Sequence, residues 1–403
     1  MYYNIISLVK KQPFCRLKSR KVLLLMRTTY LKIYLDALRH NLRAIRALVP
    51  KHTETVAVVK ANSYGYGALQ VAAMAMEEGY EALAVAVTSE AKQLREAGFK
   101  CPIYLLGLLM PEEYEDAFNT DSIIPVCEST DLQQLDETAA RFGKTASVMV
   151  AVDSGMNRIG VQAEEVPEFL EGIKKYANIT VHGFFTHYAC ADGESHEHVK
   201  RQMQRFESMV RRIPQPEKYV FTAANSSTTL YFPESYYDAV RPGQIIYGYM
   251  PEGHAETQER AAKLPKFESA LGLFSRVVHI HKIKAGDTVG YGATYKCNED
   301  TWIGTVPIGY ADGYPRCLSN TGEVLIGGRR YKVAGRVCMD QLMVDLGSET
   351  DVKVGDEVVL IGRQGNDEIT VIDIAKLANT HPDEISCQLS PRIPRVYCNK
   401  YEN

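Results

Sequence analysis

The sequence lacks several features that would place it in a specialised class of protein. No uncharged apolar run approaches the ~18 residues that a membrane-spanning helix needs, and Ile103–Met110 is among the longest. The formal net charge is only -3, so the basic excess typical of a nucleic-acid surface is missing. The nine cysteines form no CxxC pair, and such a set in a chain of 403 residues indicates reduced thiols, not a disulfide framework. These absences predict a soluble, intracellular protein.

The composition is that of an ordinary globular protein. Apolar residues make up 45% of the chain and charged residues 24%, which argues against disordered, collagen-like and coiled-coil proteins. A chain of 403 residues is long enough for two or three domains, or for one large barrel with an appendage.

Residues 1–25 differ from the rest of the chain. They carry six lysines and arginines, and no acidic residue occurs before Asp36. A secretory signal peptide would place its charges before one longer apolar core and a small-residue cleavage site, and the segment lacks both. We interpret it as a disordered tail or as the result of a start upstream of a natural one at Met26. A transit-like or membrane-surface segment is the alternative.

Between Thr55 and Gly243, short apolar runs alternate with helical stretches rich in Ala, Glu, Lys and Leu. Continuous apolar runs are expected of strands that are buried on both faces. Eight such strands separated by helices predict a (β/α)8 barrel of the TIM type within residues 26–265, with a doubly wound open sheet as the alternative. The runs are Thr55–Val59, Ala82–Val87, Pro102–Gly107, Ile123–Val126, Ser147–Val152, Val181–Thr186, Tyr219–Ala223 and Ala239–Val240.

The pattern changes after about Phe267. Segments such as GEVLIGGRRYKVAG and VGDEVVLIG are rich in β-formers and punctuated by glycine, which predicts a C-terminal, mostly-β domain over residues 266–403. Thr29–Leu35 alternates like a strand and precedes a helix that begins near Asp36. We expect this strand to pair with the C-terminal domain.

A lysine closes the first strand of the predicted barrel, where the active sites of such barrels lie. Because desolvating an ammonium group is costly, Lys60 either extends to the rim or serves as an amine of lowered pKa that forms a Schiff base. Tyr64 and the glycine-rich YGYG follow at once. They offer a phenol and backbone N–H groups to a phosphate.

The later strand ends add further polar groups. Each alone is more often a structural residue, but together they place positive charge and hydroxyl donors at one barrel mouth, and the loops after strands seven and eight often bind phosphate. A phosphate-bearing carbonyl cofactor linked to lysine is pyridoxal 5′-phosphate. The residues are Arg158 after the fifth run, His187 after the sixth, Asn225 and Ser226 after the seventh, and Arg241, Gly243 and Gln244 after the eighth.

Seven ordered segments between about Met26 and Tyr397 closely resemble motifs of bacterial alanine racemases. The resemblance implies a PLP-dependent, cytoplasmic, homodimeric isomerase that interconverts L- and D-alanine and supplies D-alanine for peptidoglycan. A serine or broad-specificity serine/alanine racemase is the alternative. The segments are VVKANSYGYG, VDSGMNRIG, FFTHYA, AANSSTT, VGYGATY, GTVPIGYADGYPR and GRVCMDQLMVD.

The resemblance also implies the roles of individual residues. Lys60 would hold the cofactor and act as the base for the D-enantiomer. Tyr291, supplied by the partner subunit, would act on the L-enantiomer, activated through His187 and Arg241. Arg241 would face the pyridine nitrogen, which a permanently charged guanidinium leaves unprotonated. The cofactor contacts would come from Tyr64, His187, Asn225, Ser226, Gly243 and Gln244, and the substrate contacts from Arg158, the backbone N–H of Met339 and Tyr310, which would line the opening.

Two positions depart from the pattern of the family. Ala151 stands where many relatives have a lysine, often carbamylated, that braces the equivalent of Arg158. Asp383 stands where the family usually has a tyrosine touching the cofactor phosphate, and serine/alanine racemases also replace that tyrosine. Because a phosphate would repel a carboxylate, we expect Asp383 to be turned away or hydrogen-bonded elsewhere.

Three other interpretations compete. PLP decarboxylases of basic amino acids place an acid where this chain has Arg241, and PLP-binding homeostasis proteins lack the β domain that carries Tyr291. His196 and His198 lie in a short acidic and histidine-rich cluster, but without further spaced ligands we interpret them as a solvated helix start with no metal.

Overall fold

The computed structural model describes residues 27–193, 195–251 and 257–400, and the basic segment 1–25 lies outside them. Within this part, the chain divides by its contacts into two compact units. The first comprises Arg39–Ser63 and most of Gly67–Phe267. The second comprises residues 27–38, Tyr64–Tyr66 and residues 268–400. No helix of the described residues is long and apolar enough to cross a membrane.

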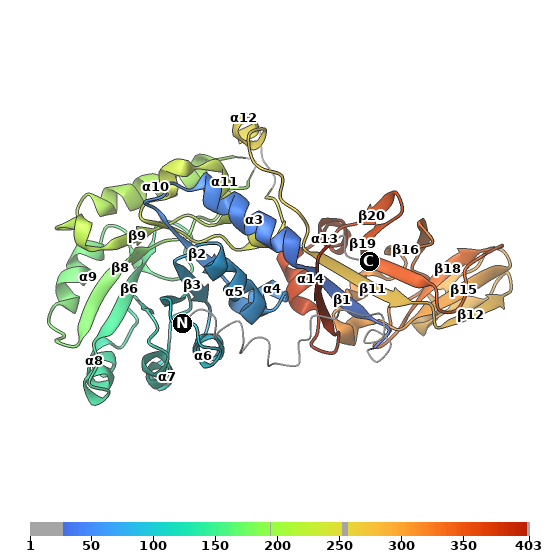
Figure 1. Ribbon diagram of the computed structural model, residues 1–403, viewed down its shortest axis with the longest axis horizontal. Coiled ribbons are helices and arrows are strands. Elements are labelled where there is room, and N and C mark those ends of the chain that lie inside the picture. The colour runs from blue at the N-terminus through green and yellow to red at the C-terminus, as the bar shows by residue number, and fades with distance from the viewer. Residues whose placement is uncertain (1–26, 194, 252–256, 401–403) are drawn as a thin grey trace. The chain divides into compact units, whose positions relative to one another are not determined.

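The sheet of the first unit has nine parallel strands, and eight of them coincide with the predicted apolar runs (Figure 1). The ninth, β7 (Val161–Gln162), pairs with the end of β6. Strands run side by side in the order β4, β3, β2, β10, β9, β8, β6, β5. A parallel bridge between Tyr104 and Ile123 joins β4 to the start of β5, so the sheet closes into the predicted (β/α)8 barrel. The strands are β2 (Glu54–Val58), β3 (Ala82–Val85), β4 (Ile103–Leu105), β5 (Ile124–Val126), β6 (Ala146–Asp153), β8 (Ile179–Phe185), β9 (Val220–Thr222) and β10 (Ala239–Val240).

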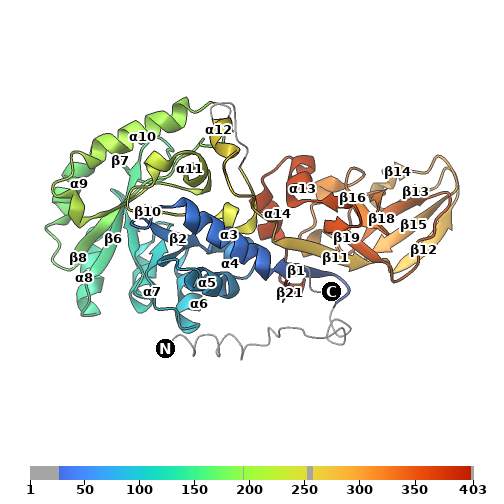
Figure 2. The same ribbon diagram turned by 45° about the horizontal axis from the view of Figure 1, so that its top comes forward.

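Helices lie around the outside of these strands (Figure 2). The longer helices bury an apolar stripe, as α8 does with Leu135 and Ala139, and the cap of α8, Asp131, accepts a hydrogen bond from the backbone N–H of Gln134. The helices are α3 (Leu35–Leu48), α5 (Ala68–Glu77), α6 (Thr88–Glu96), α7 (Tyr114–Asn119), α8 (Leu132–Arg141), α9 (Val166–Ile173), α10 (Glu197–Val210), α11 (Ser226–Tyr231) and α12 (Gln258–Ala261).

The second unit is mostly β-structure, as the glycine-punctuated pattern predicts. One sheet has the strand order β17, β16, β19, β11, β1, β21, with β20 beside β19, and a second has the order β12, β15, β18. Its strands are β1 (Tyr30–Tyr34), β11 (Leu271–Arg276), β12 (His279–Ile283), β15 (Thr301–Val306), β16 (Glu323–Ile326), β17 (Arg329–Lys332), β18 (Leu342–Gly347), β19 (Glu357–Gln364), β20 (Asp367–Ile369) and β21 (Arg395–Cys398). The helices α13 (Val371–Ala378) and α14 (Pro382–Gln388) follow β20.

Two further features of the second unit bear on the site. Strand β1 runs antiparallel to β11 and parallel to β21, so the segment Thr29–Leu35 joins the sheet of the C-terminal residues. A separate two-stranded ribbon consists of β13 (Thr288–Val289) and β14 (Tyr295–Lys296), and it carries Tyr291 at its turn.

Candidate active site

Lys60 is followed by a strained turn. The four residues from Ala61 to Tyr64 have φ near +52° to +53°, the left-handed helical region. This conformation costs roughly 1–2 kcal/mol per residue for L-amino acids. Local hydrogen bonds compensate: the Asn62 side chain accepts from the backbone N–H of Ala68 at 2.9 Å, and the Ser63 N–H donates to the Val59 carbonyl at 2.9 Å. Strain held in this way is typical of functional segments.

Arg241 is the most buried cation of the barrel mouth. It is 6% exposed, and its guanidinium donates to the Thr222 hydroxyl and, at 2.6 Å, to the Thr186 carbonyl. No carboxylate of the described residues lies within ion-pair distance of it. Burial lowers the pKa of Arg241 to about 10, so the group stays charged at neutral pH. The ends of β8, β9 and β10 therefore hold a buried positive charge that has no acidic partner in the described part of the chain.

His187 lies beside three cations. Burial first, and then repulsion by Arg241, Arg158 and Lys60, together lower its pKa from 6.5 to about 3. The imidazole is therefore neutral at neutral pH. The same repulsion shows that these four predicted site residues share one neighbourhood. The side-chain amide of Gln202 donates to the His187 carbonyl at 3.1 Å and so fixes the loop after β8.

The loops after β9 and β10 are joined by a hydrogen bond between two predicted cofactor contacts. The backbone N–H of Gly243 donates to the Ser226 hydroxyl at 3.0 Å. Asn225 has a structural role as the cap of α11: its side-chain oxygen accepts from the Thr228 N–H at 3.1 Å, and its amide donates to the Tyr188 carbonyl at 3.0 Å. Gln244 begins a short 3-10 turn, Gln244–Tyr247, directly after Gly243.

Ala151 and Arg158 lie on the wall of one small hollow. Its volume is about 10 Å³, and Thr186 and His187 also line it. Arg158 itself is exposed. The methyl group of Ala151 therefore offers Arg158 no hydrogen-bonding partner from this position.

The other predicted residues belong to the second unit. Tyr291 is 71% exposed, Met339 53% and Tyr310 41%. Tyr310 and Met339 lie close together, because the backbone N–H of Tyr310 donates to the Cys338 carbonyl at 3.0 Å and that of Ala311 to the Met339 carbonyl at 3.0 Å. Exposed large apolar side chains of this kind mark interaction or binding surfaces.

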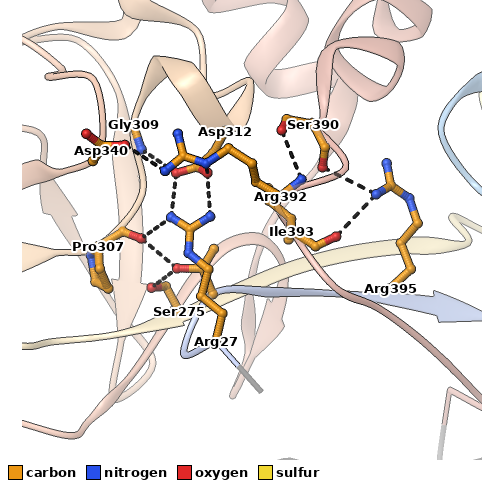
Figure 3. A network of polar contacts seen from close by, with 11 residues as sticks. Arg27, Ser275, Pro307, Gly309, Asp312, Asp340, Ser390, Arg392, Ile393 and Arg395 are labelled. Atoms are coloured by element: carbon orange, nitrogen blue, oxygen red, sulfur yellow. Dashed lines mark hydrogen bonds and ion pairs between the residues drawn. The ribbon is translucent and has the colours of Figure 1, made fainter. Parts of the chain in front are cut away.

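A buried carboxylate anchors the turn that carries Tyr310 (Figure 3). Asp312 is fully buried and receives both terminal nitrogens of the Arg27 guanidinium, while Arg392 lies 3.6 Å away. Arg392 also pairs with Asp340 at 2.7 Å, next to Met339. No local pattern in the sequence marks this network, because its bonded partners Arg27 and Asp312 lie 285 residues apart in the sequence.

Tyr64 belongs to the second unit, and Asp383 lies close to the Tyr64 phenol. Burial is the main reason that the pKa of the Tyr64 phenol is far above its usual value, and the negative charge of Asp383 raises it further. The Asp383 carboxylate also lies 3.6 Å from the His381 imidazole. Gly65 allows a close approach to α14, since a Cβ there would lie 2.3 Å from the Ser386 carbonyl oxygen.

One interpretation of the histidine cluster was wrong. His196 is not solvated: it is 1% exposed and packs edge-on against Phe232, with ring centroids 5.1 Å apart. It occupies the position just before α10, which begins at Glu197. The sequence pattern missed this burial because Phe232 lies far along the chain.

Comparisons with known proteins agree with the barrel and the β domain. The chain matches the family "Alanine racemase, N-terminal domain" over residues 33–251 and the family "Alanine racemase, C-terminal domain" over residues 270–397. An alanine racemase of Desulforamulus reducens is 40% identical over 375 residues, which cover 91% of this chain and 98% of that protein.

Solved structures give the same result. Alanine racemase from E. faecalis superposes with a TM-score of 0.84 at 34% identity, over 92% of this chain and 98% of that one. The alanine racemase from Bacillus anthracis with bound L-Ala-P superposes with a TM-score of 0.84 at 35% identity, over 93% of this chain and 96% of that one. The fold is thus that of a TIM-type barrel with a C-terminal β domain. The chain belongs to the alanine racemase family and is an enzyme of the isomerase class.

Proposed function

We propose that this enzyme interconverts L- and D-alanine with pyridoxal 5′-phosphate as its cofactor, by proton transfer on opposite faces of the substrate Cα. It would act as a cytoplasmic homodimer and supply D-alanine for peptidoglycan. The observation that carries the proposal is the group of cations at the barrel mouth. Lys60, Arg158 and Arg241 each help to lower the pKa of His187, and the buried Arg241 has no carboxylate partner among the described residues.

The donor set of the mouth fits the proposed cofactor. A site with surplus positive charge favours an anionic ligand, and the Ser226 hydroxyl, which accepts from the Gly243 N–H, keeps its own O–H as a donor of the kind that binds phosphate. Lys60, at the end of β2, provides the amine that a carbonyl cofactor needs. When bound, pyridoxal 5′-phosphate stabilises the negative charge that develops at the substrate Cα as its proton leaves.

Arg241 is suited to face the pyridine nitrogen. Its pKa of about 10 is set by burial, yet the guanidinium stays protonated at working pH and has no acceptor lone pair. Two hydrogen bonds to Thr222 and Thr186 fix its plane. It would therefore hold its proton and donate a hydrogen bond to the ring nitrogen of a bound cofactor without protonating it.

Two residues would move the proton at Cα. Lys60 Nζ would exchange it on the face of the D-enantiomer, and Tyr291 Oη on the face of the L-enantiomer. The exposed Tyr291, Tyr310 and Met339 support the view that a partner subunit brings this surface to the barrel mouth. Arg158 and the Met339 N–H would hold the substrate carboxylate, and Tyr64, Asn225 and Gln244 would complete the cofactor contacts.

Two variants test the proposal. Lys60→Ala should purify without the yellow colour of bound cofactor, whereas Lys51→Ala, an exposed lysine, should keep it. Tyr291→Phe should keep the colour but lose activity by ~10²–10⁴-fold, the usual loss on removal of a general base. The α-proton of L-alanine should then exchange with solvent more slowly than that of D-alanine. Equal exchange from both enantiomers would contradict the two-base assignment.

A further inference from the structure

Tyr291 lies on a short ribbon whose shape depends on contacts outside the ribbon. The ribbon, residues 288–296, has two residues in each strand, and its turn has positive φ at Gly290, Gly292 and Ala293. Isolated two-stranded ribbons are marginally stable in water. The Tyr291 hydroxyl makes no hydrogen bond within the described residues, and its side chain is 71% exposed. The position of the phenol oxygen therefore depends on what holds the ribbon.

A carboxylate of the neighbouring sheet lies next to the ribbon, within hydrogen-bonding reach of Tyr295. Asp345 of β18 is opposite Ile303 of β15, and Ile303 forms an apolar cluster with Val289 and Cys297 at the two ends of the ribbon. A charged group in such surroundings is costly unless it is hydrogen-bonded. Apolar packing therefore does not explain why Asp345 occupies this position.

Three donors satisfy the Asp345 carboxylate. The Tyr295 hydroxyl donates to one oxygen. The other oxygen accepts from the Thr301 hydroxyl at 2.5 Å and from the Gly347 N–H at 3.0 Å. Burial alone would raise the pKa of Asp345, but these hydrogen bonds lower it below its ordinary value. Asp345 is therefore ionised at neutral pH, and charge-assisted bonds of this kind are about twice as strong as neutral ones.

The bond from Tyr295 is the side-chain link between the second strand of the ribbon and the sheet. Tyr295 pairs with Val289 in the ribbon, so fixing its ring also fixes the strand before Tyr291. At the turn, Asn320 donates to the Thr294 hydroxyl at 3.2 Å and accepts from the Gly335 N–H at 2.7 Å. The turn and the second strand of the ribbon are thus each hydrogen-bonded to other parts of the second unit.

We propose that Tyr295 and Asp345 are positioning residues for the reaction, because their hydrogen bond sets where the Tyr291 hydroxyl stands when it exchanges the substrate proton. The inference rests on the proposed function of Tyr291. Neither residue touches substrate, and both act through the backbone of the ribbon. A misplacement of about 1 Å at a reacting group can lower a rate by ~10²-fold, so loss of one bond can matter without unfolding the domain.

The experiment compares Tyr295→Phe with Tyr331→Phe in the full-length, cofactor-loaded enzyme. Tyr331, in β17, has no hydroxyl hydrogen bond among the described residues, so its variant is the matched control. We expect Tyr295→Phe to lower kcat by about 10-fold or more, with KM for alanine changed by less than about 2-fold. Solvent exchange of the α-proton should slow for L-alanine and stay near wild type for D-alanine. Tyr331→Phe should match wild type in all four quantities.

Asp345 supplies a graded series. Asp345→Asn keeps an oxygen acceptor and should retain more activity than Asp345→Ala. Amide hydrogen exchange of the cofactor-free protein gives a readout independent of activity: residues 288–297 should exchange faster in Tyr295→Phe, with the β19 and β11 amides unchanged. Faster exchange throughout the unit, or equal slowing for both enantiomers, would mean a general stabilising role and would overturn the inference.

The two proposals fail in different ways. If Tyr291→Phe leaves exchange from L-alanine intact, the proposed function of Tyr291 is wrong. If Tyr291→Phe slows that exchange but Tyr295→Phe and Asp345→Ala do not, only the positioning role is wrong.

Discussion

His187 should remain neutral far below the pH at which a histidine normally gains a proton. Burial and the charges of Arg241, Arg158 and Lys60 lower its pKa from 6.5 to about 3. In the unfolded chain the imidazole has no such neighbours and should titrate near its ordinary value of about 6.5. Between pH 6.5 and pH 3 the unfolded state therefore binds more protons than the folded state at this residue.

Proton linkage gives the sign and size of the effect of His187 on the free energy of unfolding. Because the folded pKa is depressed, the contribution to the free energy of unfolding is fully present above about pH 6.5 and is lost as the pH falls towards 3. The loss approaches about 1.4 kcal/mol per pH unit in that window, or about 2 kcal/mol at pH 5. The uncharged variant His187→Gln should not show this loss of stability at low pH.

Two measurements check this prediction. In the cofactor-free protein with 13C-labelled histidine, the NMR signal that disappears in His187→Gln should keep its neutral chemical shift between pH 8 and pH 5. Urea unfolding at pH 7.5 and pH 5 should show that wild type loses about 2 kcal/mol more than His187→Gln. Other titrating groups cancel in that difference. A His187 signal that titrates near pH 6.5 would refute the reasoning.

Three further predictions concern packing, a buried charge and substrate choice. Gly183→Ala should lower the free energy of unfolding by about 3 kcal/mol, because its Cβ would lie 1.9 Å from the Val220 carbonyl oxygen, whereas Gly172→Ala, with open space around it, should not destabilise. In urea unfolding, Asp312→Ala should cost about 1–3 kcal/mol because it removes the buried acceptor that the partly exposed Arg27 and Arg392 share, and Asp340→Ala, half exposed, should cost no more than about 1 kcal/mol. Asp383→Tyr should lower the ratio of kcat/KM for L-serine to that for L-alanine, since a carboxylate acceptor can favour a hydroxylated substrate by ~1–3 kcal/mol. An unchanged ratio would show that Asp383 does not select the substrate.

The sequence by itself determined the barrel. Each of the eight apolar runs became a parallel strand, because burial on both faces leaves a local pattern that needs no knowledge of the partner strand. The polar residues that follow those runs can also be identified from the local sequence. The sequence therefore predicted that Lys60, His187 and Arg241 lie in one site. Their shared neighbourhood follows from the rule that parallel strands end at the same edge.

The tertiary structure alone decided how those residues are held. Thr186 and Thr222 orient Arg241, Arg27 and Arg392 meet on Asp312, and Tyr295 binds Asp345, yet no spacing in the sequence marks any of these pairs. The burial of His196 escaped notice for the same reason. Hydrogen bonds and ion pairs depend on which distant segments the fold brings within about 3 Å of each other, and periodicity reports only which face of its own element a residue occupies.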